Sequence, residues 1–344
     1  MSNLKVPVTI ITGFLGSGKT TLIKHILSTK NEKKIALIIN EFGDLGVDLE
    51  LINECNVDNC DYDNFVELTN GCICCAVADD FLPTIRRLLE QKEKPEHIVI
   101  ETSGLALPKP LVKAFNWPEV KSRATVDSVI AVVDSKAVHD GQFAENPEEI
   151  EKIRELDEGL DHESPLEEVF EDQVLCADMI LLNKSDLLTK SELDSVKTEV
   201  VRITNTNVKM LATNYGKIDT SILLGLEAAA ENFVEKKPSH HDDDGEHDHD
   251  EFESFVVKIK NITDPDLIEE RVKKVVREHQ VLRVKGFINV PEKEMRHVIQ
   301  GVGENINRYY DRAWLRDELR ETSIVIIGIS GLDKKAISDF LCAK

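Results

Sequence analysis

The chain has 344 residues, of which 41% are hydrophobic and 31% are charged. This composition is typical of a globular protein with a substantial core, and the length favours two domains. No apolar run approaches the roughly 20 residues that a membrane-spanning helix needs, which argues against a membrane protein. No signal-peptide pattern follows Met1, so a cytoplasmic location is expected.

The formal net charge of -22 is concentrated in two segments. Residues 140–172 contain 14 acidic residues against 2 basic ones, and residues 242–251 contain 7 acidic residues and no basic one. The rest of the chain is nearly balanced. A surface without a basic patch gives no footprint for nucleic acid or for an anionic membrane, so neither is expected as a partner.

Apolar runs alternate with helical patterns over the first two thirds of the chain. Buried strands are expected at residues 6–12, 35–39, 97–100, 126–133 and 179–182. Helices are expected between them, for example at residues 81–91 and 191–204. Buried strands that alternate with helices predict an α/β fold with a doubly wound, mostly parallel sheet.

A second, smaller domain is expected after a polar linker. Residues 236–251 contain no aliphatic or aromatic residue and are predicted to be disordered. The linker histidines His240, His241, His247 and His249, set among carboxylates, are suited to weak capture of divalent ions, and the alternative is a charged linker that is only solvated. The predicted organisation is a nucleotide-binding domain at 1–235 with an acidic insertion at 140–172, the linker at 236–251, and an α+β domain at 252–344.

Within the second domain, the pattern predicts strands at residues 252–260, 281–290 and 322–329. Helices are predicted at residues 265–278 and 293–300.

The segment Gly13–Thr20 matches the phosphate loop G-x-x-x-x-G-K-[ST], and it lies between an expected strand and an expected helix. Its glycines let backbone N–H groups surround the phosphates, Lys19 neutralises the β- and γ-phosphates, and the Thr20 hydroxyl binds Mg²⁺. The fold is therefore predicted to be that of a P-loop NTPase. The nucleotide-binding residues expected here are Gly13, Gly16, Ser17, Gly18, Lys19, Thr20 and Thr21.

Two further segments follow expected strands. Asn183-Lys184-Ser185-Asp186 is an N-K-x-D sequence, in which the Asp186 carboxylate accepts hydrogen bonds from N1–H and the amino group of guanine. Adenine has no matching donor pair, so GTP is expected rather than ATP, with residues 212–216 as a further base-contacting loop. Glu101 of the segment Glu101–Gly104 is the candidate acid on the magnesium side, and Gly104 is the candidate sensor of the γ-phosphate.

Three of the seven cysteines, Cys72, Cys74 and Cys75, lie within four residues. A disulfide between adjacent cysteines is strained and is not expected in a reducing compartment. Thiolates select zinc, cobalt and similar ions, and a tetrahedral site needs a fourth ligand. The sequence therefore predicts a transition-metal site.

With these motifs in this order, together with Asn40-Glu41-Phe42-Gly43, the chain resembles the CobW family of P-loop GTPases and metallochaperones. Residues 160–166 and the acidic segment before them are similar to the branch that serves cobalamin biosynthesis. The resemblance implies that Cys72, Cys74 and Cys75 bind metal, with Glu41 and Asp44 as candidate additional ligands. It also implies a nucleotide-sensitive switch at residues 40–48.

The resulting hypothesis is a GTP-hydrolysing metallochaperone that uses GTP, Mg²⁺ and a transition metal, Co²⁺ or Zn²⁺. Lys19, Thr20 and Glu101 are its candidate catalytic residues, and hydrolysis is expected to be slow and stimulated by metal. The resemblance implies a metal-requiring client protein, for which a cobaltochelatase is one candidate, and cobalt for cobalamin biosynthesis is the leading cargo. The alternatives are a zinc chaperone of the same family and a passive metal-binding protein in which nucleotide is a structural ligand. A P-loop kinase is disfavoured, because no acceptor-site motif is present.

Overall fold

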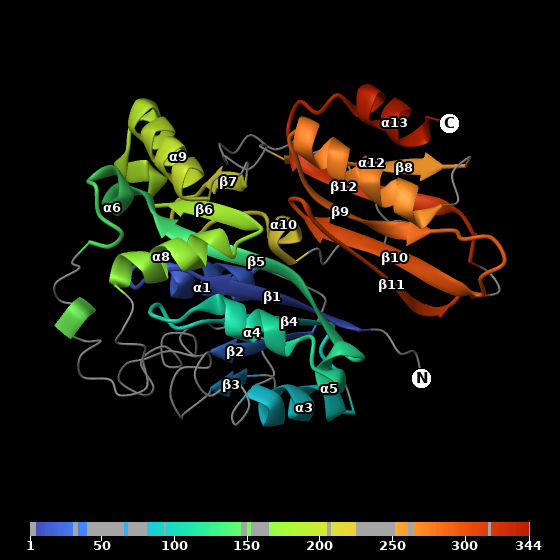
Figure 1. Cartoon of the computed structure of the whole chain (residues 1–344), viewed down its shortest axis with the longest axis horizontal. Helices are drawn as coiled ribbons and strands as arrows, with labels where there is room; N and C mark the ends of the chain where they lie inside the picture. The colour runs from blue at the N-terminus through green and yellow to red at the C-terminus, as the bar shows by residue number, and fades with distance from the viewer. Residues whose placement is uncertain are drawn as a thin grey trace. The chain divides into compact units, whose positions relative to one another are not determined.

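The structure is a computed structural model. It describes residues 5–29, 34–39, 65–67, 81–92, 94–145, 150–152, 165–204, 208–224, 252–260, 264–315 and 318–343. The described chain divides into two compact units, of which the first is Lys5–Lys217 and the second begins at Ile218. Each unit is built around its own β-sheet (Figure 1). Among the described helices, none is both long and apolar enough to cross a lipid bilayer.

Seven parallel strands of the described chain form the first sheet, in the order β3-β2-β4-β1-β5-β6-β7. They are β1 (Val6–Thr12), β2 (Ile35–Ile39), β3 (Phe65–Glu67), β4 (His97–Glu101), β5 (Ala124–Asp134), β6 (Met179–Asn183) and β7 (Lys209–Ala212). Every residue of β4 and β6 is buried, as expected for parallel strands that are covered on both faces. The predicted doubly wound, mostly parallel sheet is confirmed.

Helices connect these strands and complete two apolar cores. They are α1 (Lys19–Ser28), α3 (Leu82–Glu90), α4 (Pro108–Ala114), α5 (Pro118–Lys121), α6 (Ser135–His139), α8 (Leu166–Leu175), the 3-10 helix η3 (Ser185–Leu187) and α9 (Lys190–Thr204). One core joins Ile10 and Ile100 of the sheet to Leu88 of α3. The other joins Ile180 of the sheet to Phe170 of α8 and Val196 of α9. Helix α10 (Thr220–Leu224) belongs to the second unit.

The second unit contains an antiparallel sheet of five described strands in the order β11-β10-β9-β12-β8. They are β8 (Phe252–Ile259), β9 (Val281–Ile288), β10 (Met295–Val302), β11 (Asn305–Ala313) and β12 (Thr322–Ile329). Helices α12 (Pro265–Glu278) and α13 (Lys334–Cys342) cover one face of this sheet (Figure 1). Val276 of α12 and Ile337 of α13 pack there against Ile324 and Ile326 of β12. The predicted small α+β domain is confirmed.

The helix predicted at residues 293–300 is wrong, because Met295–Val302 forms strand β10. Its side chains alternate between the two faces of the sheet, and Ile299 packs into the core beneath α12. The polar residues Arg296 and Gln300 are both buried on the opposite face of the sheet. Strand β11, which pairs with β10, was not predicted at all.

Helix α10 is attached to the second sheet through a buried arginine. The Nη1 group of Arg283 donates hydrogen bonds to the carbonyl oxygens of Ile222 and Leu223, each at 3.1 Å. These carbonyls belong to the last turn of α10, where the carbonyl oxygens of a helix have no N–H donor within the helix itself. Arg283 is only 1% exposed, so its charge depends on acceptors of this kind.

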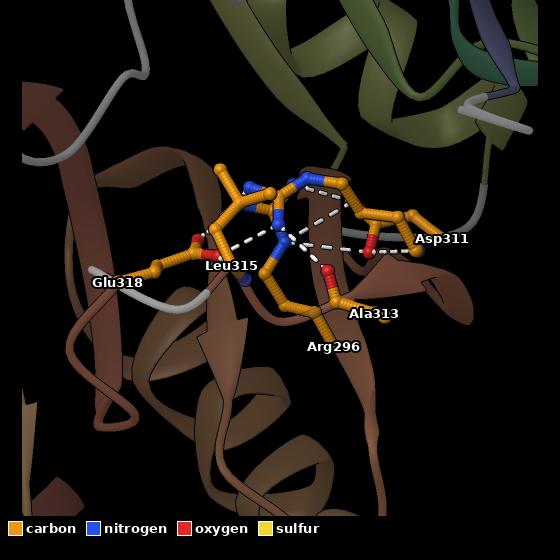
Figure 2. Close-up of polar contacts among 6 residues, drawn as sticks. Arg296, Asp311, Ala313, Leu315 and Glu318 are labelled. Atoms are coloured by element: carbon orange, nitrogen blue, oxygen red, sulfur yellow. Dashed lines mark hydrogen bonds and ion pairs between the residues drawn. The ribbon is translucent and has the colours of Figure 1, made fainter. Parts of the chain in front are cut away.

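Paired charges hold the end of β11 and the segment after it (Figure 2). Arg296 of β10 donates to Asp311 of β11 at 2.5 Å and to Glu318 at 2.8 Å, and Arg312 also donates to Glu318, at 2.6 Å. The Arg296 guanidinium lies 3.8 Å from the centre of the Phe287 ring. The segment after β11 is thus tied to the sheet mainly by charge-assisted hydrogen bonds.

The pKa of Glu318 reflects this network. Burial by itself would raise the pKa of this carboxyl. Hydrogen bonds from Arg312 and from the Leu315 N–H, together with the charge and hydrogen bond of Arg296, outweigh burial and lower the pKa from 4.5 to about 2. Because the folded-state pKa is depressed, the stabilisation is present above pH 4.5 and is lost as the pH falls towards 2.

We therefore expect Glu318→Gln to flatten the acid side of the stability profile of the second unit. Above pH 5 the variant should be less stable than the parent by on the order of 2–3 kcal/mol, and the difference should shrink as the pH falls towards 2. Urea unfolding followed by Trp314 fluorescence in a Trp117→Phe background measures this, since the sequence has two tryptophans. Glu304→Gln is the control, because Glu304 forms an exposed ion pair with Arg277. Parallel pH profiles for parent and Glu318→Gln would contradict the assignment.

Candidate functional site

Four neighbouring strands of the first sheet bring polar residues to one edge. Strand β1 ends at Thr12, β4 at Glu101, β5 at Asp134 and β6 at Asn183. Because the strands are parallel, these carboxyl ends lie at the same edge of the sheet. In open α/β sheets this edge is where ligands bind.

The phosphate-loop sequence leaves β1 and enters α1 with the backbone that such a loop requires. Gly13, Gly16 and Gly18 have φ angles of +138°, +75° and +104°, a region that disfavours residues with a Cβ atom. A Cβ atom on Gly18 would also lie 2.2 Å from the Asn183 amide nitrogen. The loop therefore turns into α1 with its N–H groups at the positive end of the helix, a suitable site for phosphate.

The candidate catalytic side chains lie in and beside this loop. Lys19 is 7% exposed, and its Nζ donates to the carbonyl oxygen of Phe14 within the loop at 3.1 Å. The Thr20 hydroxyl lies 3.5 Å from Oε1 of Glu101, which is 2% exposed. A hydroxyl and a buried carboxylate at one point are the oxygen ligands that Mg²⁺ prefers, so these residues fit the expected ion.

The segment after β4 packs directly against the phosphate loop. A Cβ atom on Gly104 would lie 2.6 Å from the side chain and 2.8 Å from the backbone nitrogen of Leu15. On the other side, Nε2 of Gln173 in α8 donates to the carbonyl oxygens of Gly104 and Ala106, each at 3.0 Å. Gln173 is fully buried, so the position of this loop is fixed by α8 as well as by the sheet.

Asn183 connects the two nucleotide motifs. Its amide group donates to the carbonyl oxygen of Ser17 in the phosphate loop at 2.9 Å. Its Oδ1 atom accepts from the Gly216 N–H at 3.1 Å and lies 3.3 Å from the Thr213 hydroxyl. One buried side chain therefore positions the phosphate loop, the N-K-x-D segment and the 212–216 loop relative to one another.

The 212–216 loop also shapes the base-reading segment. Oδ1 of Asn214 accepts from the Asp186 N–H at 3.0 Å and from the Ser185 hydroxyl at 2.5 Å. The Asp186 carboxylate itself is exposed and makes no hydrogen bond to any other described residue. It is therefore available to a ligand at this edge of the sheet.

Lys184, the second residue of the N-K-x-D segment, has a left-handed backbone with φ of +57°. Its Nζ lies 2.5 Å from Oδ2 of Asp134. Oδ1 of Asp134 also caps α6 by accepting from the N–H groups of Lys136 and Ala137. Asp134 is 4% exposed, so this carboxylate anchors both the base-reading segment and the start of a helix.

Sequence reasoning did not single out Asp134 or Gln173. Asp134 had a signal, because it is an acidic residue at the end of a buried apolar run in the same way as Glu101. Gln173 had none, because its partners are 67 and 69 residues away in the chain.

The predicted metal ligands Cys72, Cys74, Cys75, Glu41 and Asp44 lie outside the described residues, as does the predicted switch at residues 40–48. Within the part of the chain that the structure describes, no cluster of three or more His, Cys, Asp or Glu side chains could hold a metal ion. The histidines of the 236–251 segment also lie outside the described residues.

Comparison with known proteins gives the family. Residues 7–212 match the CobW/HypB/UreG nucleotide-binding domain, and residues 252–343 match the cobalamin synthesis protein cobW C-terminal domain. The chain belongs to the CobW family of P-loop GTPases.

Three relatives of this family cover nearly the whole chain. The zinc chaperone CobW of a Sinorhizobium species is 51% identical over 97% of this chain and 95% of its own length. The protein of the same name from Pseudomonas aeruginosa is 46% identical over 98% of this chain and 91% of its own. The zinc chaperone YjiA of Escherichia coli is 32% identical over 94% of both chains. The solved Zn(II)-bound structure of YjiA has a TM-score of 0.41 at 25% identity and covers 98% of both chains.

The Lys184–Asp134 pair leads to a first prediction about this site. Asp134→Asn keeps an oxygen for the α6 cap but removes the charge that holds Lys184. We expect GDP and GTP to bind about 10-fold more weakly, the scale of one charge-assisted hydrogen bond. Titration with a fluorescent GDP analogue measures the effect, and thermal unfolding separates it from a loss of stability. Asp140→Asn is the matched control, since Asp140 pairs with Lys136 at the exposed surface. Unchanged nucleotide affinity in Asp134→Asn would show that the pair has no part in binding.

Proposed function

We propose that this protein is a cytoplasmic GTPase metallochaperone, which binds a transition metal at Cys72, Cys74 and Cys75 and delivers it to a client protein under the control of GTP. The observation that carries the proposal is the junction at Asn183, which joins a phosphate loop to a guanine-reading segment at one edge of the sheet. Family membership supports the same reading.

The proposed nucleotide chemistry is the hydrolysis of GTP to GDP and phosphate. Water attacks the γ-phosphorus, and the bond from that phosphorus to the β–γ bridging oxygen breaks. Lys19 neutralises charge on the transferring phosphoryl group, and Thr20 with Glu101 would hold Mg²⁺, which would supply further positive charge to the phosphates. The Gly104 N–H reports on the γ-phosphate. The closeness of Thr20 to Glu101 and the packing of Gly104 on the phosphate loop support these roles.

The proposed cargo is zinc. Sequence reasoning placed cobalt first, through the resemblance to proteins of cobalamin biosynthesis. The two relatives that are 51% and 46% identical over almost the whole chain are named zinc chaperones, which favours zinc as the first ion to test. Thiolate ligands suit both ions, so cobalt stays in the experiment as the competitor.

Strand register supports a coupling between nucleotide and metal. At the carboxyl edge of the sheet, Ile39 of β2 pairs with Glu67 of β3 and with Glu101 of β4. The proposed switch follows Ile39, and the proposed cysteine ligands follow Glu67 by a few residues. The switch therefore follows the strand next to that of the candidate magnesium acid, and the cysteine segment follows the strand after that one in the sheet. We infer that ordering of the switch by GTP brings Glu41 or Asp44 towards the thiolates and tightens metal binding.

A passive metal-binding protein, with nucleotide as a structural ligand, is the second candidate function. The exposed Asp186 carboxylate and the part-buried Thr20–Glu101 pair favour an active GTPase, because a nucleotide with only a structural role does not need a magnesium site arranged for hydrolysis. The two functions differ in one measurable property, which is whether metal affinity depends on the γ-phosphate.

The base-reading role of Asp186 predicts a change of nucleotide. Asp186→Asn replaces an acceptor by a donor, so GTP should bind more weakly by about 2–4 kcal/mol, on the order of 100-fold. Xanthosine triphosphate should bind the variant better than GTP does, because xanthine offers an acceptor where guanine has its amino group. Competition titrations measure both affinities, and Asp194→Asn serves as an exposed control on α9. If the variant kept the GTP affinity of the parent, the guanine assignment would be wrong.

Coupling predicts that zinc binds more tightly to the GTP state than to the GDP state. Allosteric couplings are typically about 5- to 150-fold, and by linkage zinc should raise GTP affinity by the same factor. We would titrate zinc and cobalt into the forms loaded with a non-hydrolysable GTP analogue, with GDP and without nucleotide. The pH is held fixed, because thiolate ligation releases protons. Equal metal affinities in all three forms would leave the passive protein as the better account.

Cys74→Ala is the companion variant for that experiment. It should abolish the nucleotide dependence of metal binding while GDP affinity stays unchanged. Cys176→Ala is the matched control, because Cys176 is a half-buried thiol at the end of α8. Burial raises the pKa of the Cys176 thiol to about 11, so it is a poor metal ligand near neutral pH.

A further inference from the structure

A groove of about 600 Å³ lies among α6, α8 and α9 on the first unit. Its volume is within the range of roughly 300–1,000 Å³ that is usual for ligand sites. Apolar side chains from three segments line it, namely Phe143, Phe170, Val196 and Ile203. The groove is separate from the strand edge that carries the nucleotide motifs, since its lining comes from the helices and from the turn after α6.

The charged residues around this groove are mostly acidic. Glu167 and Glu171 of α8 and Glu199 of α9 line it, against one guanidinium, that of Arg202, and the imidazole of His139. Arg202 already pairs with Glu199, and His139 lies 3.5 Å from Glu192. Among the described residues, Glu167 and Glu171 form no ion pair or hydrogen bond. The Glu167 and Glu171 carboxylates can therefore bind a ligand beside the apolar side chains that form the floor of the groove, and both belong to the acidic 140–172 segment.

An aromatic chain connects the floor of the groove to the phosphate loop. The Phe143 ring lies 6.4 Å from the Phe170 ring and packs edge-on against Phe14 at 5.0 Å, measured between ring centres. Phe14 is part of the phosphate loop, and its carbonyl oxygen accepts the hydrogen bond from Lys19. A side chain inserted next to Phe143 thus touches a residue in direct contact with the phosphate loop.

Helix α8 provides a second connection. Glu171 lines the groove, and Gln173, two residues further along the same helix, holds the carbonyl oxygens of Gly104 and Ala106. Two residues span about 200° of an α-helix, so these side chains leave nearly opposite sides of α8. A small rotation or shift of α8 would move the groove wall and the Gly104 loop together.

We propose that this groove docks a positively charged amphipathic segment of the client protein, and that docking is coupled to the nucleotide state through Phe143 and α8. The client role rests on the function proposed above. Charge selects the occupant, because carboxylates without a partner among the described residues, next to an aromatic floor, match lysine or arginine side chains flanking an apolar anchor. The acidic 140–172 segment would also attract such a partner over a distance.

Docking can be tested without knowing the client. The probe is a fluorescein-labelled 18-residue helical peptide with leucine and tryptophan on one face and lysine on the other. Anisotropy titration with the full chain loaded with GDP, without transition metal, gives its affinity. We expect the double variant Glu167→Lys, Glu171→Lys to bind the peptide at least about 10-fold more weakly than the parent. A peptide with glutamate in place of lysine should show no binding.

The matched control is the double variant Glu168→Lys, Asp194→Lys, which makes the same change of net charge at exposed positions that do not line the groove. It should retain the affinity of the parent within about 2-fold, since long-range attraction alone is screened by salt. Equal losses in the two double variants would overturn the proposal and reduce the binding to non-specific charge.

A dimer seen by sedimentation in the parent, and lost only in the groove variant, would also overturn the proposal in favour of a second copy of this chain. Circular dichroism establishes that each variant is folded.

The coupling is tested by repeating the titration with a non-hydrolysable GTP analogue. Peptide affinity should differ between the two nucleotide states by about 5-fold or more. Phe143→Leu keeps an apolar floor but removes the ring contact with Phe14, so the peptide should still bind while the difference between the states falls. Equal affinities in the two states of the parent would overturn the coupling. Because the assay contains no transition metal, a failure of the proposed cysteine site would leave these results unchanged.

Discussion

The amide of Asn183 is the interaction on which the nucleotide site depends. It donates to the Ser17 carbonyl oxygen, and its own oxygen accepts from the Gly216 N–H. A primary amide is suited to this position because it offers a donor and an acceptor at once. The side chain is 3% exposed, so water cannot replace either partner without opening the core. The spacing between the phosphate loop and the base-reading segment is therefore set by protein contacts before any nucleotide arrives.

The close approach of Asn183 also explains a residue of the phosphate loop. Gly18 has a left-handed backbone, and a Cβ atom there would lie 2.2 Å from the Asn183 amide nitrogen. The glycine is therefore required by a contact across the sheet edge as well as by phosphate binding. The pairing of Lys184 with Asp134 continues the same arrangement to the next strand, so that β1, β5 and β6 are all joined where the ligand would bind.

Much of this arrangement was predictable from the sequence, and the reason is local. The strands β1, β2, β4 and β6 are continuous apolar runs because both of their faces are covered, and each motif directly follows one of them. The contacts that fix the motifs were not predictable, because they join distant parts of the chain. Lys184, for example, pairs with Asp134, which is 50 residues away in the sequence. Strand β10 was predicted as a helix, and the partners of its buried Arg296, Asp311 and Glu318, lie 15 and 22 residues further along the chain. Local patterns identify chemistry, whereas buried charge pairs are visible only after folding.

The contact between Arg283 and the last turn of α10 determines where a fragment of the second unit can begin. The boundary suggested by composition alone lies within the polar 236–251 segment, and a fragment beginning after it would omit α10. Arg283 would then lose two carbonyl acceptors while remaining in the middle of the sheet, and an incompletely solvated buried guanidinium costs several kcal/mol. A fragment of the second unit meant for expression should therefore begin before Ile218. By the same physics, a gene fusion that exchanged this unit between relatives would have to carry α10 along with the sheet.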